Sequence, residues 1–438
     1  MEQNSTEGQG TLEAGLEALA LYGQEQAQTP PSFATAEKKR CGNGTFIRAP
    51  RGKELQDLIF QKNARHPAGG LKWTDEEDLR RQRGVAWDVV KQIGSNIIEG
   101  KDLVSVSLPV YLFEPRSFLE RLCDGFSFAP TYLTKAAATT DPLERLKNVI
   151  AFFIAGTHLT ATQKKPFNPI LGETYQATFS EDGTEVFAEQ TTHHPPASNF
   201  QVIPQDGSYH FWGHGVFSAV YRGNLIKGYQ TGPNYVDFPD GTRISIQLPY
   251  LEFKGLVMGD RIQNFAGNMS FVDQKNDLGC VLEFNPEAPS WLKSWFAKPK
   301  YPADYFVGDI FRLSTANTAT TSASASNAGS SSGAAVNDKK EVLSRVEGCW
   351  LSHLDFDSKR YWDLKEVVPS TLQPVDDPLP SDCRFRDDLQ ALLAGDFATA
   401  QQQKVLLEER QRGDARLRKE GAAARQGAGD ASRSLLSP

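Results

Sequence analysis

The stretch Glu189-Gln190-Thr191-Thr192-His193-His194-Pro195-Pro196 is the most informative part of this chain of 438 residues. Proline fixes its own φ angle and biases the residue before it toward an extended conformation. His194 is therefore kept out of a helix, and two extended neighbours point their rings in different directions. Such a pair is poorly placed to chelate a metal but well placed to aim two donors at one anionic group. A turn that carries two surface histidines without a function is the alternative interpretation.

The composition indicates a soluble globular protein, with 39% hydrophobic and 23% charged residues. A net charge of −7 disfavours general nucleic-acid binding by a basic surface. No apolar segment at the N-terminus resembles a signal peptide, and the run from Val149 to Ala155 is too short to span a bilayer. A disulfide framework or zinc ribbon is disfavoured because the five cysteines are widely spaced without a C-x-x-C pattern: Cys41, Cys123, Cys280, Cys349 and Cys383. We expect a cytoplasmic protein without cofactor or metal.

The N-terminal part of the chain changes character near Trp73. Residues 1–72 are predicted to be a largely disordered leader, because polar, Gly and Pro residues dominate. Thr74 followed by Glu77 is a capping-box pattern that predicts the start of a helix. An apolar stripe at helical spacing follows, interrupted by Gly94, and consists of Trp87, Val90, Ile93, Ile97 and Ile98. Such a stripe is most often buried in a core, but it also suits a segment that covers the mouth of a cavity.

The middle of the chain is predicted to form strands. Ile244, Ile246 and Leu248 alternate with polar residues, and turn signals such as Asp240-Gly241 recur between short apolar segments. This spacing indicates an antiparallel barrel or sandwich, and no βαβ rhythm is present. Before it, Asp141-Pro142 predicts a helix start. After it, residues 314–338 form a low-complexity insertion between strands, a helix is expected from about Ala398 to Arg418, and 419–438 are predicted to be a disordered tail.

Two further stretches carry groups suited to an anion. The first, from Lys164 to Glu173, is a loop stiffened by Pro166 and Pro169, in which Asn168 can donate and accept. In the second, a spacing of four places Lys404, Glu408 and Arg412 on one helical face. Arginine grips a phosphate with two hydrogen bonds, whereas lysine acts as a point charge. Taken alone, the two stretches are equally compatible with a rigid polar loop and a solvated charged face.

Together the three stretches resemble the signature motifs of the oxysterol-binding-protein lipid-transfer family, in the right order over roughly residues 73–418. The histidine motif usually has Val-Ser where this chain has Thr191-Thr192. The second motif is Lys165-Pro166-Phe167-Asn168-Pro169-Ile170-Leu171-Gly172-Glu173. The C-terminal signature comprises Leu379-Pro380-Ser381-Asp382-Cys383-Arg384, Asp387, Gly395-Asp396, Ala400, Lys404, Glu408 and Gln411-Arg412, with Cys383 where Ser is usual.

The resemblance implies a mainly β fold of α+β type: a large incomplete antiparallel β-barrel that encloses a lipid tunnel, with an N-terminal helical lid and flanking helices. The lid would span about residues 77–107 and use Trp87, Val90, Ile93 and Ile97. By residue match, His193, His194 and Arg412 would hold the 4-phosphate of phosphatidylinositol 4-phosphate. Lys165, Lys404 and Glu408 would complete that headgroup site, with Asn168 nearby.

The second lipid is expected to be phosphatidylserine, because residues 103–120 resemble the family branch that exchanges it for phosphatidylinositol 4-phosphate. The serine headgroup would lie beside Leu108, with Lys165 and Asn168. Sterol remains open as the second ligand. A lipid sensor with the same pocket but no net transfer is a further alternative. The resemblance implies a monomer that contacts membranes, or membrane contact sites, transiently and peripherally.

An enzyme is the remaining class, and it is disfavoured. His210 and His214, four apart in a predicted strand, could join His193 or His194 in a metallohydrolase. The chain has no H-E-x-x-H, no G-x-S-x-G and no phosphate-binding Gly-rich loop, so we expect no catalytic residues. The apolar residues Trp291, Leu292, Trp295 and Phe296 among Lys293, Lys298 and Lys300 suit an anionic membrane surface, or equally a plug at one end of the barrel.

Overall fold

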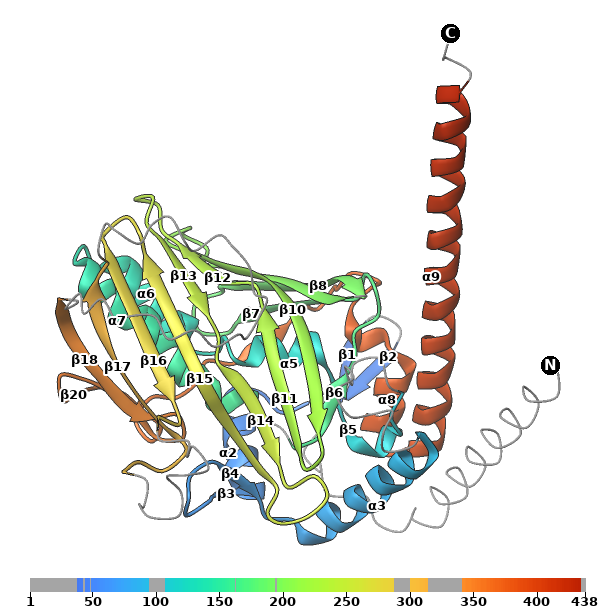
Figure 1. Ribbon diagram of the computed structural model, residues 1–438, viewed down its shortest axis with the longest axis horizontal. Coiled ribbons are helices and arrows are strands. Elements are labelled where there is room, and N and C mark those ends of the chain that lie inside the picture. The colour runs from blue at the N-terminus through green and yellow to red at the C-terminus, as the bar shows by residue number, and fades with distance from the viewer. Residues whose placement is uncertain are drawn as a thin grey trace, which may run out of the picture.

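A single large antiparallel sheet organises the molecule (Figure 1). The computed structural model describes residues 38–41, 44–47, 49–93, 107–161, 163–193, 195–286, 300–313 and 341–434. Within these residues the sheet has seventeen strands. They are β3 (Asn63–Arg65), β4 (Leu71–Trp73), β7 (Thr174–Phe179), β8 (Glu185–His193), β9 (Pro196–Ile203), β10 (His210–Arg222), β11 (Leu225–Thr231), β12 (Asn234–Asp237), β13 (Arg243–Gln247), β14 (Tyr250–Lys254), β15 (Ile262–Asp273), β16 (Leu278–Phe284), β17 (Tyr305–Arg312), β18 (Val342–Cys349), β19 (His353–Phe356), β20 (Lys359–Asp363) and β21 (Leu372–Pro374).

The sheet closes into a barrel through its two longest strands. β10, with 13 residues, pairs with β9 along one edge and with both β11 and β12 along the other. β15, with 12 residues, likewise pairs with both β13 and β14. It also pairs with β16. Because β11 pairs with β14 and β12 with β13, these strands form a closed ring. The predicted mainly β, antiparallel barrel is confirmed.

Three helices pack against the sheet and supply much of the core: α5 (Phe118–Asp124), α6 (Ala129–Ala138) and α7 (Pro142–Thr157). Asp141 caps α7 by accepting a hydrogen bond from the Leu143 amide at 3.0 Å, as the Asp-Pro signal predicts. The ring of Phe152 meets Phe211 of β10 edge to face at 5.1 Å. These contacts bury one apolar side of the helices against the sheet.

The predicted leader is wrong for residues 49–72, which are structured. The chain forms β1 (Lys38–Cys41) and β2 (Gly44–Ile47), then α2 (Gly52–Lys62), β3 and β4. α2 buries Leu55 and Ile59, and β4 pairs with β15. The strands β3 and β4 have only three residues each, too few for a periodic signal, and they are stabilised by pairing with a distant strand. Residues 1–37 lie outside the described residues.

Helix α3 (Glu76–Ile93) begins one residue later than the capping-box pattern predicts. Asp75 provides the cap, since its Oδ1 accepts a hydrogen bond from the Asp78 amide at 2.9 Å. The Thr74 hydroxyl instead donates to the Lys62 carbonyl at 2.8 Å, at the end of α2. The expected lid therefore corresponds to α3 and to residues 94–106, the latter outside the described residues.

Short elements and one long helix complete the chain. β5 (Phe113–Ser117) follows η2 (Val110–Leu112) and pairs in parallel with β6 (Lys165–Phe167), while η3 (His158–Thr160) follows α7. After η5 (Cys383–Phe385) come α8 (Asp387–Leu393) and α9 (Phe397–Ser434), which extends beyond the barrel in Figure 1. Residues 419–434, predicted to be disordered, are helical here; alanines such as Ala422 and Ala423 favour that state.

The low-complexity insertion lies outside the described residues, but its flanks are informative. β17 and β18 pair antiparallel on either side of it, and the Arg312 amide donates to the Glu341 carbonyl at 3.0 Å. The insertion therefore connects two neighbouring strands, as predicted. None of the helices in the described part of the chain is both long and apolar enough to cross a membrane.

Candidate functional site

The three sequence motifs converge at Thr174, the first residue of β7. Its predecessor Glu173 ends the second motif, and Thr174 pairs with Glu189 of the histidine motif in β8. The Thr174 amide donates to the Ser381 carbonyl of the C-terminal motif at 2.9 Å. Its hydroxyl also shares a hydrogen bond with the Ser381 hydroxyl at 3.0 Å. Segments more than 200 residues apart are thus fixed at one point of the barrel.

A buried carboxylate, Glu173, holds the second motif in shape. Its Oε2 accepts hydrogen bonds from Arg386 Nη1 at 2.8 Å and from the Ile170 amide at 3.0 Å, and its Oε1 accepts one from the Ser117 hydroxyl. Arg386 Nη1 also donates to the Asn168 carbonyl at 2.8 Å, and its guanidinium lies 5.2 Å from the centre of the Phe167 ring. One arginine therefore fixes both ends of the Phe167-Asn168 segment.

The charged groups in this network are buried and paired. Burial raises the pKa of Glu173, although Arg386 counteracts that shift. For Arg386, burial favours loss of the proton, but Glu173 and Asp388 outweigh it and raise the pKa. Asp388 accepts from Arg386 Nη2 at 2.8 Å. A buried arginine with two carboxylate partners is rigid, because loss of the arginine would leave two buried carboxylates without a cation.

Gln190 connects the second motif to the histidine motif. Its carbonyl accepts from the Gly172 amide at 2.8 Å, and its side-chain Nε2 donates to the Thr192 carbonyl at 2.8 Å. A register shift between Gln190 and Thr192 bends the strand before His193. The Thr192 hydroxyl then donates to the Pro195 carbonyl at 2.6 Å, which closes the turn between β8 and β9. His193 is half-buried at the end of β8, whereas His194 lies outside the described residues.

The Thr residues that depart from the usual family pattern both make hydrogen bonds through their hydroxyls. Thr191 Oγ1 accepts from Asn199 Nδ2 at 2.9 Å, and Asn199 Oδ1 contacts His214 Nδ1 at 2.5 Å. Valine at this position could not make the first of these bonds. Cys383 is fully buried, and burial raises the pKa of its thiol, so that it packs as a small apolar side chain.

Two lysines from different motifs meet at the ring of Phe113. Lys165 Nζ lies 5.0 Å and Lys404 Nζ 5.3 Å from the centre of that ring. Lys165 also donates to Asn168 Oδ1. The Phe113 ring packs on Phe167 at 5.0 Å, within an apolar cluster that also contains Val110, Leu392 and Ala400. The structure therefore places Lys165 beside Asn168, and both Lys165 and Lys404 beside Phe113.

Glu408 and Ser107 orient the Lys404 ammonium group. Lys404 Nζ donates to Glu408 Oε1 at 2.6 Å and to the Ser107 hydroxyl at 3.1 Å, and that hydroxyl donates to Glu408 Oε2 at 2.7 Å. Only 4% of the Lys404 side chain is exposed, so its charge is stabilised by these contacts rather than by water. The spacing of four predicts the Lys404–Glu408 pair. Ser107 and Phe113 are not predicted, because only the tertiary fold brings them there.

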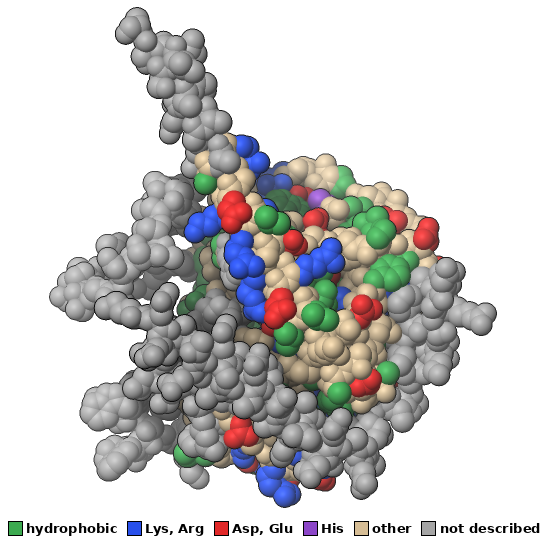
Figure 2. All heavy atoms as spheres, turned by 90° about the vertical axis from the view of Figure 1, so that its right-hand side faces the viewer, with side chains coloured by type: hydrophobic (Ala, Val, Ile, Leu, Met, Phe, Trp, Pro, Cys, Tyr) green, Lys and Arg blue, Asp and Glu red, His purple; other side chains and the backbone are tan. Residues whose placement is uncertain are grey.

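The other predicted site residues lie around this cluster. Leu108 is half-buried and packs against the apolar cluster of Val110 and Phe113. Arg412 is exposed on α9, eight residues or about 12 Å beyond Lys404. It is not part of the Lys404 cluster. Figure 2 shows Lys and Arg side chains gathered along the face that carries α9, with Asp and Glu side chains between them.

Helix α3 is tied to the lysine motif through Asp78. Lys164 Nζ lies 3.1 Å from Asp78 Oδ1, and the Tyr111 hydroxyl donates to the same oxygen at 3.2 Å. Lys164 also lies 5.0 Å from the centre of the Tyr111 ring. The expected lid residues Trp87, Val90 and Ile93 lie farther along α3, where only the backbone is described, and Ile97 lies outside the described residues.

Part of the sheet near this site is less deeply buried than the rest. In β10, Phe211, Gly213 and Gly215 are fully buried, but no residue from 216 to 222 is. The neighbouring β11 likewise contains no fully buried residue. Apolar side chains such as Val220 and Ile226 are half-buried there. This region offers an apolar surface that the described core does not fully cover.

The geometry gives no support to a metallohydrolase. His210 and His214 both lie in β10, and His214 is engaged with Asn199. Burial lowers the pKa of His210, whose ring stacks on Trp212 at 6.2 Å. Across the residues that the structure describes, no three His, Cys, Asp or Glu side chains form a group that could hold a metal. The aromatic residues from Trp291 to Phe296 lie outside that part of the chain.

Comparison with known proteins identifies similar chains. A family profile described as "Oxysterol-binding protein" matches residues 88–427. "Oxysterol-binding protein 9" of Dictyostelium discoideum is 42% identical over 369 residues, which cover 84% of this chain and 83% of that protein. "Oxysterol-binding protein-related protein 8" of Mus musculus is 28% identical over 386 residues, which cover 83% of this chain but only 39% of that protein.

Solved structures share the fold. The Osh1 ORD domain in complex with cholesterol superposes with a TM-score of 0.59 at 21% identity, covering 84% of this chain and 87% of that one. The Osh3 ORD of Saccharomyces cerevisiae in complex with PI(4)P gives a TM-score of 0.57 at 21% identity, covering 76% and 84%. At this identity the likeness establishes the architecture and not the ligand.

Proposed function

The chain belongs to the oxysterol-binding protein family, and on this premise we propose that it binds one lipid at a time and exchanges phosphatidylinositol 4-phosphate for a second lipid between membranes. Related folds have been solved with PI(4)P, with cholesterol and with ergosterol. The proposal for this chain rests on its own residues as well as on that relationship. It assigns binding and transfer to the protein rather than catalysis.

The observation that carries the proposal is the pair of ammonium groups at Phe113. Lys165 and Lys404 both lie about 5 Å from the centre of one ring, and the Lys404 side chain is almost fully buried. An anion beside this ring would interact favourably with both cations. A phosphate sheltered from water would interact with both more strongly than it would at an exposed site. Glu408 would keep Lys404 aimed at this anion.

The 4-phosphate would lie on the side of Lys165 and Lys404 that faces the turn after His193. We assign it to His193, His194 and Arg412, with Asn168 beside Lys165. His193 ends a strand that Gln190 anchors to the second motif, so its backbone position is fixed relative to Lys165. Arg412 is exposed, which suits a group that meets the headgroup while the lipid is still in a membrane.

The lipid chains would lie against the less deeply buried part of the sheet. The half-buried apolar side chains of β10 and β11 support this placement, because acyl chains or a sterol ring would complete their burial. The expected lid, with Trp87, Val90, Ile93 and Ile97, would cover them. The Lys164–Asp78–Tyr111 contacts would connect the first turn of α3 to the headgroup site.

Phosphatidylserine is the second lipid we favour, with its headgroup near Leu108, Lys165 and Asn168. Leu108 packs beside Phe113, which contacts both lysines, so a headgroup at Leu108 would compete with phosphate for Lys165. Such competition would make the two lipids mutually exclusive, as exchange requires. Sterol is the alternative second ligand, and a sensor that binds without net transfer is the alternative function. We place the protein at membranes or membrane contact sites as a peripheral monomer.

The test is transfer between liposomes by the purified chain. Phosphatidylinositol 4-phosphate starts in one population and phosphatidylserine in the other, and the native chain is compared with His193→Ala/His194→Ala. Counter-exchange that the double variant loses supports the proposal. Phosphoinositide transfer without movement of phosphatidylserine supports sterol as the second ligand. Tight binding without any transfer supports the sensor, and absence of binding contradicts all three.

A matched control distinguishes loss of the site from general damage. Arg410→Ala removes an exposed cation from α9, two residues from Arg412. Its transfer rate should equal that of the native chain. Extraction of both lipids after incubation, followed by mass spectrometry, should return them unaltered, since the proposal includes no chemical step. Any stoichiometric product would favour the enzyme alternative.

A further inference from the structure

The loop between β14 and β15 presents two adjacent apolar side chains to solvent. Val257 is 40% exposed and Met258 is 68% exposed. In the described part of the chain only Leu417 is as exposed as Met258 among the large hydrophobic residues. Apolar side chains in a flexible loop usually fold back onto the protein, because contact with water is unfavourable. A loop that keeps two of them outward therefore needs a structural cause.

The cause is a set of hydrogen bonds from Asn224, in the turn between β10 and β11. Asn224 Oδ1 accepts from the amides of Val257 at 2.8 Å and Met258 at 3.2 Å. Its Nδ2 donates to the Met258 carbonyl at 2.9 Å. One side chain thus binds the backbone of both tip residues, and both apolar side chains remain exposed. These hydrogen bonds hold the backbone of Val257 and Met258 in one conformation.

Glycines and an arginine from α3 complete the frame. Gly255 and Gly259 adopt φ angles of +74° and +81°, and a Cβ on Gly255 would lie 1.9 Å from the Asp260 carbonyl oxygen. Only glycine fits at that position. Arg83 of α3 donates from Nη2 to the Gly255 carbonyl at 2.9 Å and also to the Gly259 carbonyl. The loop is therefore fixed to α3, which forms the first part of the expected lid.

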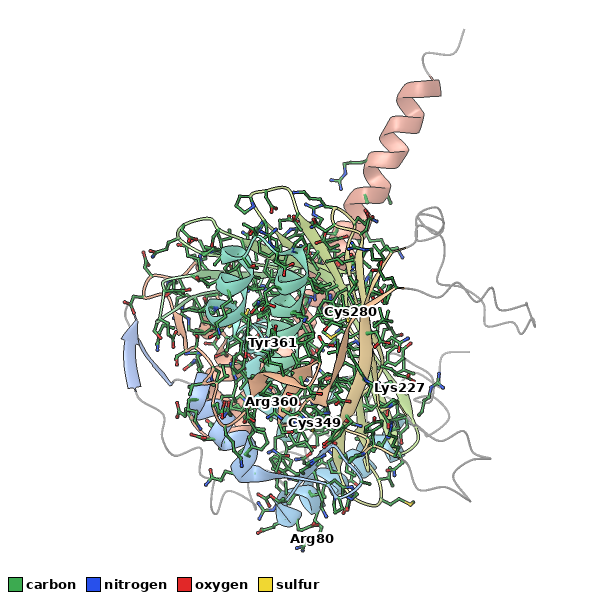
Figure 3. The ribbon with its side chains drawn as sticks, turned by 90° about the vertical axis from the view of Figure 1, so that its left-hand side faces the viewer. Arg80, Lys227, Cys280, Cys349, Arg360 and Tyr361 are labelled. Carbon is green, nitrogen blue, oxygen red and sulfur yellow. The ribbon has the colours of Figure 1, made fainter. Side chains whose placement is uncertain are left out.

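The strands behind the tip carry amphipathic side chains. Tyr229 of β11 and Tyr250 of β14 are 37% and 47% exposed, and their rings meet edge to face at 6.4 Å. Lys227 Nζ lies 5.2 Å from the centre of the Tyr250 ring, and Lys254 is about half exposed. In Figure 3, Lys227 lies at the periphery of the molecule, as does Arg80 of α3. Tyrosines and lysines behind an apolar tip are the residues found at the interface of a bilayer.

The carboxylates nearest to the tip are paired, so they do not oppose an anionic surface strongly. Glu252 lies 3.1 Å from Lys227 and 3.3 Å from Lys254. Asp260 lies 2.8 Å from Lys72, and His66 is 3.3 Å from its other oxygen. Arg83 and Arg222 add positive charge, and Arg222 is exposed. The charge around the tip favours phospholipid over an acidic protein.

We propose that Val257 and Met258 form a membrane-inserting tip that docks the protein on a phospholipid surface. The tip is convex and small, so it fits between lipid headgroups, whereas a protein partner would have to supply a matching pocket. Val257 and Met258 enter the acyl boundary, while Lys227, Lys254, Tyr229 and Tyr250 meet the headgroups. The inference rests on the proposed function only in that a transfer protein must touch a membrane. The tip is separate from the headgroup site.

The experiment measures co-flotation with vesicles of phosphatidylcholine and phosphatidylglycerol, neither of which is a proposed ligand. Val257→Asp/Met258→Asp should bind these vesicles at least tenfold more weakly than the native chain, since partial burial of the two side chains exceeds the ~1.4 kcal/mol that tenfold requires. The control is Val368→Asp, a residue of 56% exposure in another loop, which should bind like the native chain. Unchanged binding by the tip variant would overturn the proposal, and equal loss in the control would show that the effect is not specific to the tip.

A second measurement reports insertion directly. Met258→Cys is labelled with an environment-sensitive fluorophore in a Cys41→Ser background, because Cys123, Cys280, Cys349 and Cys383 are all buried. The emission should shift to the blue when vesicles are added, and the same label at Val368→Cys should not respond. Emission at Met258→Cys that stays unchanged while the protein floats with vesicles contradicts insertion.

The docking proposal and the lipid-exchange proposal can be tested separately. Binding of a soluble short-chain phosphatidylinositol 4-phosphate needs the headgroup site but no membrane. The tip variant should bind this lipid with native affinity. If the native chain binds vesicles through the tip but does not bind the soluble lipid, the docking proposal stands and the exchange proposal fails.

Discussion

Arg386 donates a hydrogen bond to Glu173 at 2.8 Å, although 213 residues separate them in the sequence. The bond joins the C-terminal motif to the lysine loop inside the protein, where both charges are buried. Because Arg386 also donates to the Asn168 carbonyl, the position of Lys165 depends on a residue buried in the core. The motif that carries Arg386 therefore supports the site as well as contributing Lys404 to it.

Arg386→Lys should lower both stability and affinity for phosphatidylinositol 4-phosphate. Lysine keeps the charge but cannot reach Glu173, Asp388 and the Asn168 carbonyl at once. We expect the free energy of unfolding to fall by about 1–3 kcal/mol, measured by urea denaturation. The comparison is Arg384→Lys, since Arg384 is paired with Asp382 at 2.9 Å and bonds the Val375 carbonyl instead. Native affinity in Arg386→Lys would show that the loop holds its shape without this arginine.

Lys404→Met should weaken headgroup binding while the fold is retained. Methionine keeps most of the side-chain packing against Phe113 but removes a buried charge that would face the phosphate. A charge-assisted hydrogen bond contributes about 1.5–3 kcal/mol, so we expect affinity for short-chain phosphatidylinositol 4-phosphate to fall by about tenfold or more in calorimetry.

Two comparisons make the Lys404 result specific. Arg410→Met, at an exposed position on the same helix, should leave affinity unchanged. Lys404→Met/Glu408→Gln should not be weaker than Lys404→Met alone, because Glu408 acts by orienting Lys404. A further large loss in the double variant would mean that Glu408 contacts the lipid independently.

Asp78→Asn should accelerate the release of bound lipid. The change removes the ion pair with Lys164 and weakens the hydrogen bond from Tyr111, so α3 would separate from the site more readily. Trp87→Asp/Ile93→Asp should have the same effect if the apolar stripe covers the lipid. Release is measured as the loss of a fluorescent lipid to acceptor vesicles. An unchanged rate in both variants would remove α3 as part of the lid.

The sequence contains enough local information to propose the charged residues of the candidate site, but not the residues that hold them in position. The Lys404–Glu408 pair follows from helical spacing, and the turn after His193 follows from its prolines. Phe113, Ser107 and Arg386 escape prediction because each acts across more than 50 residues of chain, through contacts that only the closed sheet creates. The same reason explains the structured residues 49–72, whose short elements depend on β15 and the core.

Helix starts show a second limit of local patterns. Asp141 and Asp75 both cap helices through their side chains, but the Thr74–Glu77 pattern points one residue too early. The Thr74 hydroxyl instead donates a hydrogen bond to the Lys62 carbonyl at the end of α2. Two candidate capping residues in succession cannot be ranked without knowing which of them has another partner. The mainly β prediction is more robust, because it rests on many strands rather than on one residue.

The stability of the protein should decrease as the pH falls below about 6.5, with the largest contribution from the buried His158. His158 is fully buried, stacks on Trp362 at 5.7 Å, and contacts Gln56 Oε1 through Nε2 at 3.1 Å. Burial lowers its pKa to about 3. Between this value and the usual value near 6.5, the unfolded chain binds a proton that the folded chain does not. Stability therefore rises with pH across this window and is lost as the pH falls, by at most about 1.4 kcal/mol per pH unit.

His158→Gln should weaken this dependence while it preserves a partner for Gln56; His210 and His353, whose pKa values burial also lowers, retain part of it. The free energy of unfolding is measured by urea denaturation between pH 5 and pH 6.5. Below that range carboxylates such as Glu120, whose pKa is about 2 because Arg116 and Arg51 outweigh the effect of burial, add losses of the same sign. His66→Gln, which changes a partly exposed histidine, is the control and should keep the native slope. An equal slope in His158→Gln would mean that His158 accepts a proton without unfolding the core, which its burial against Trp362 argues against.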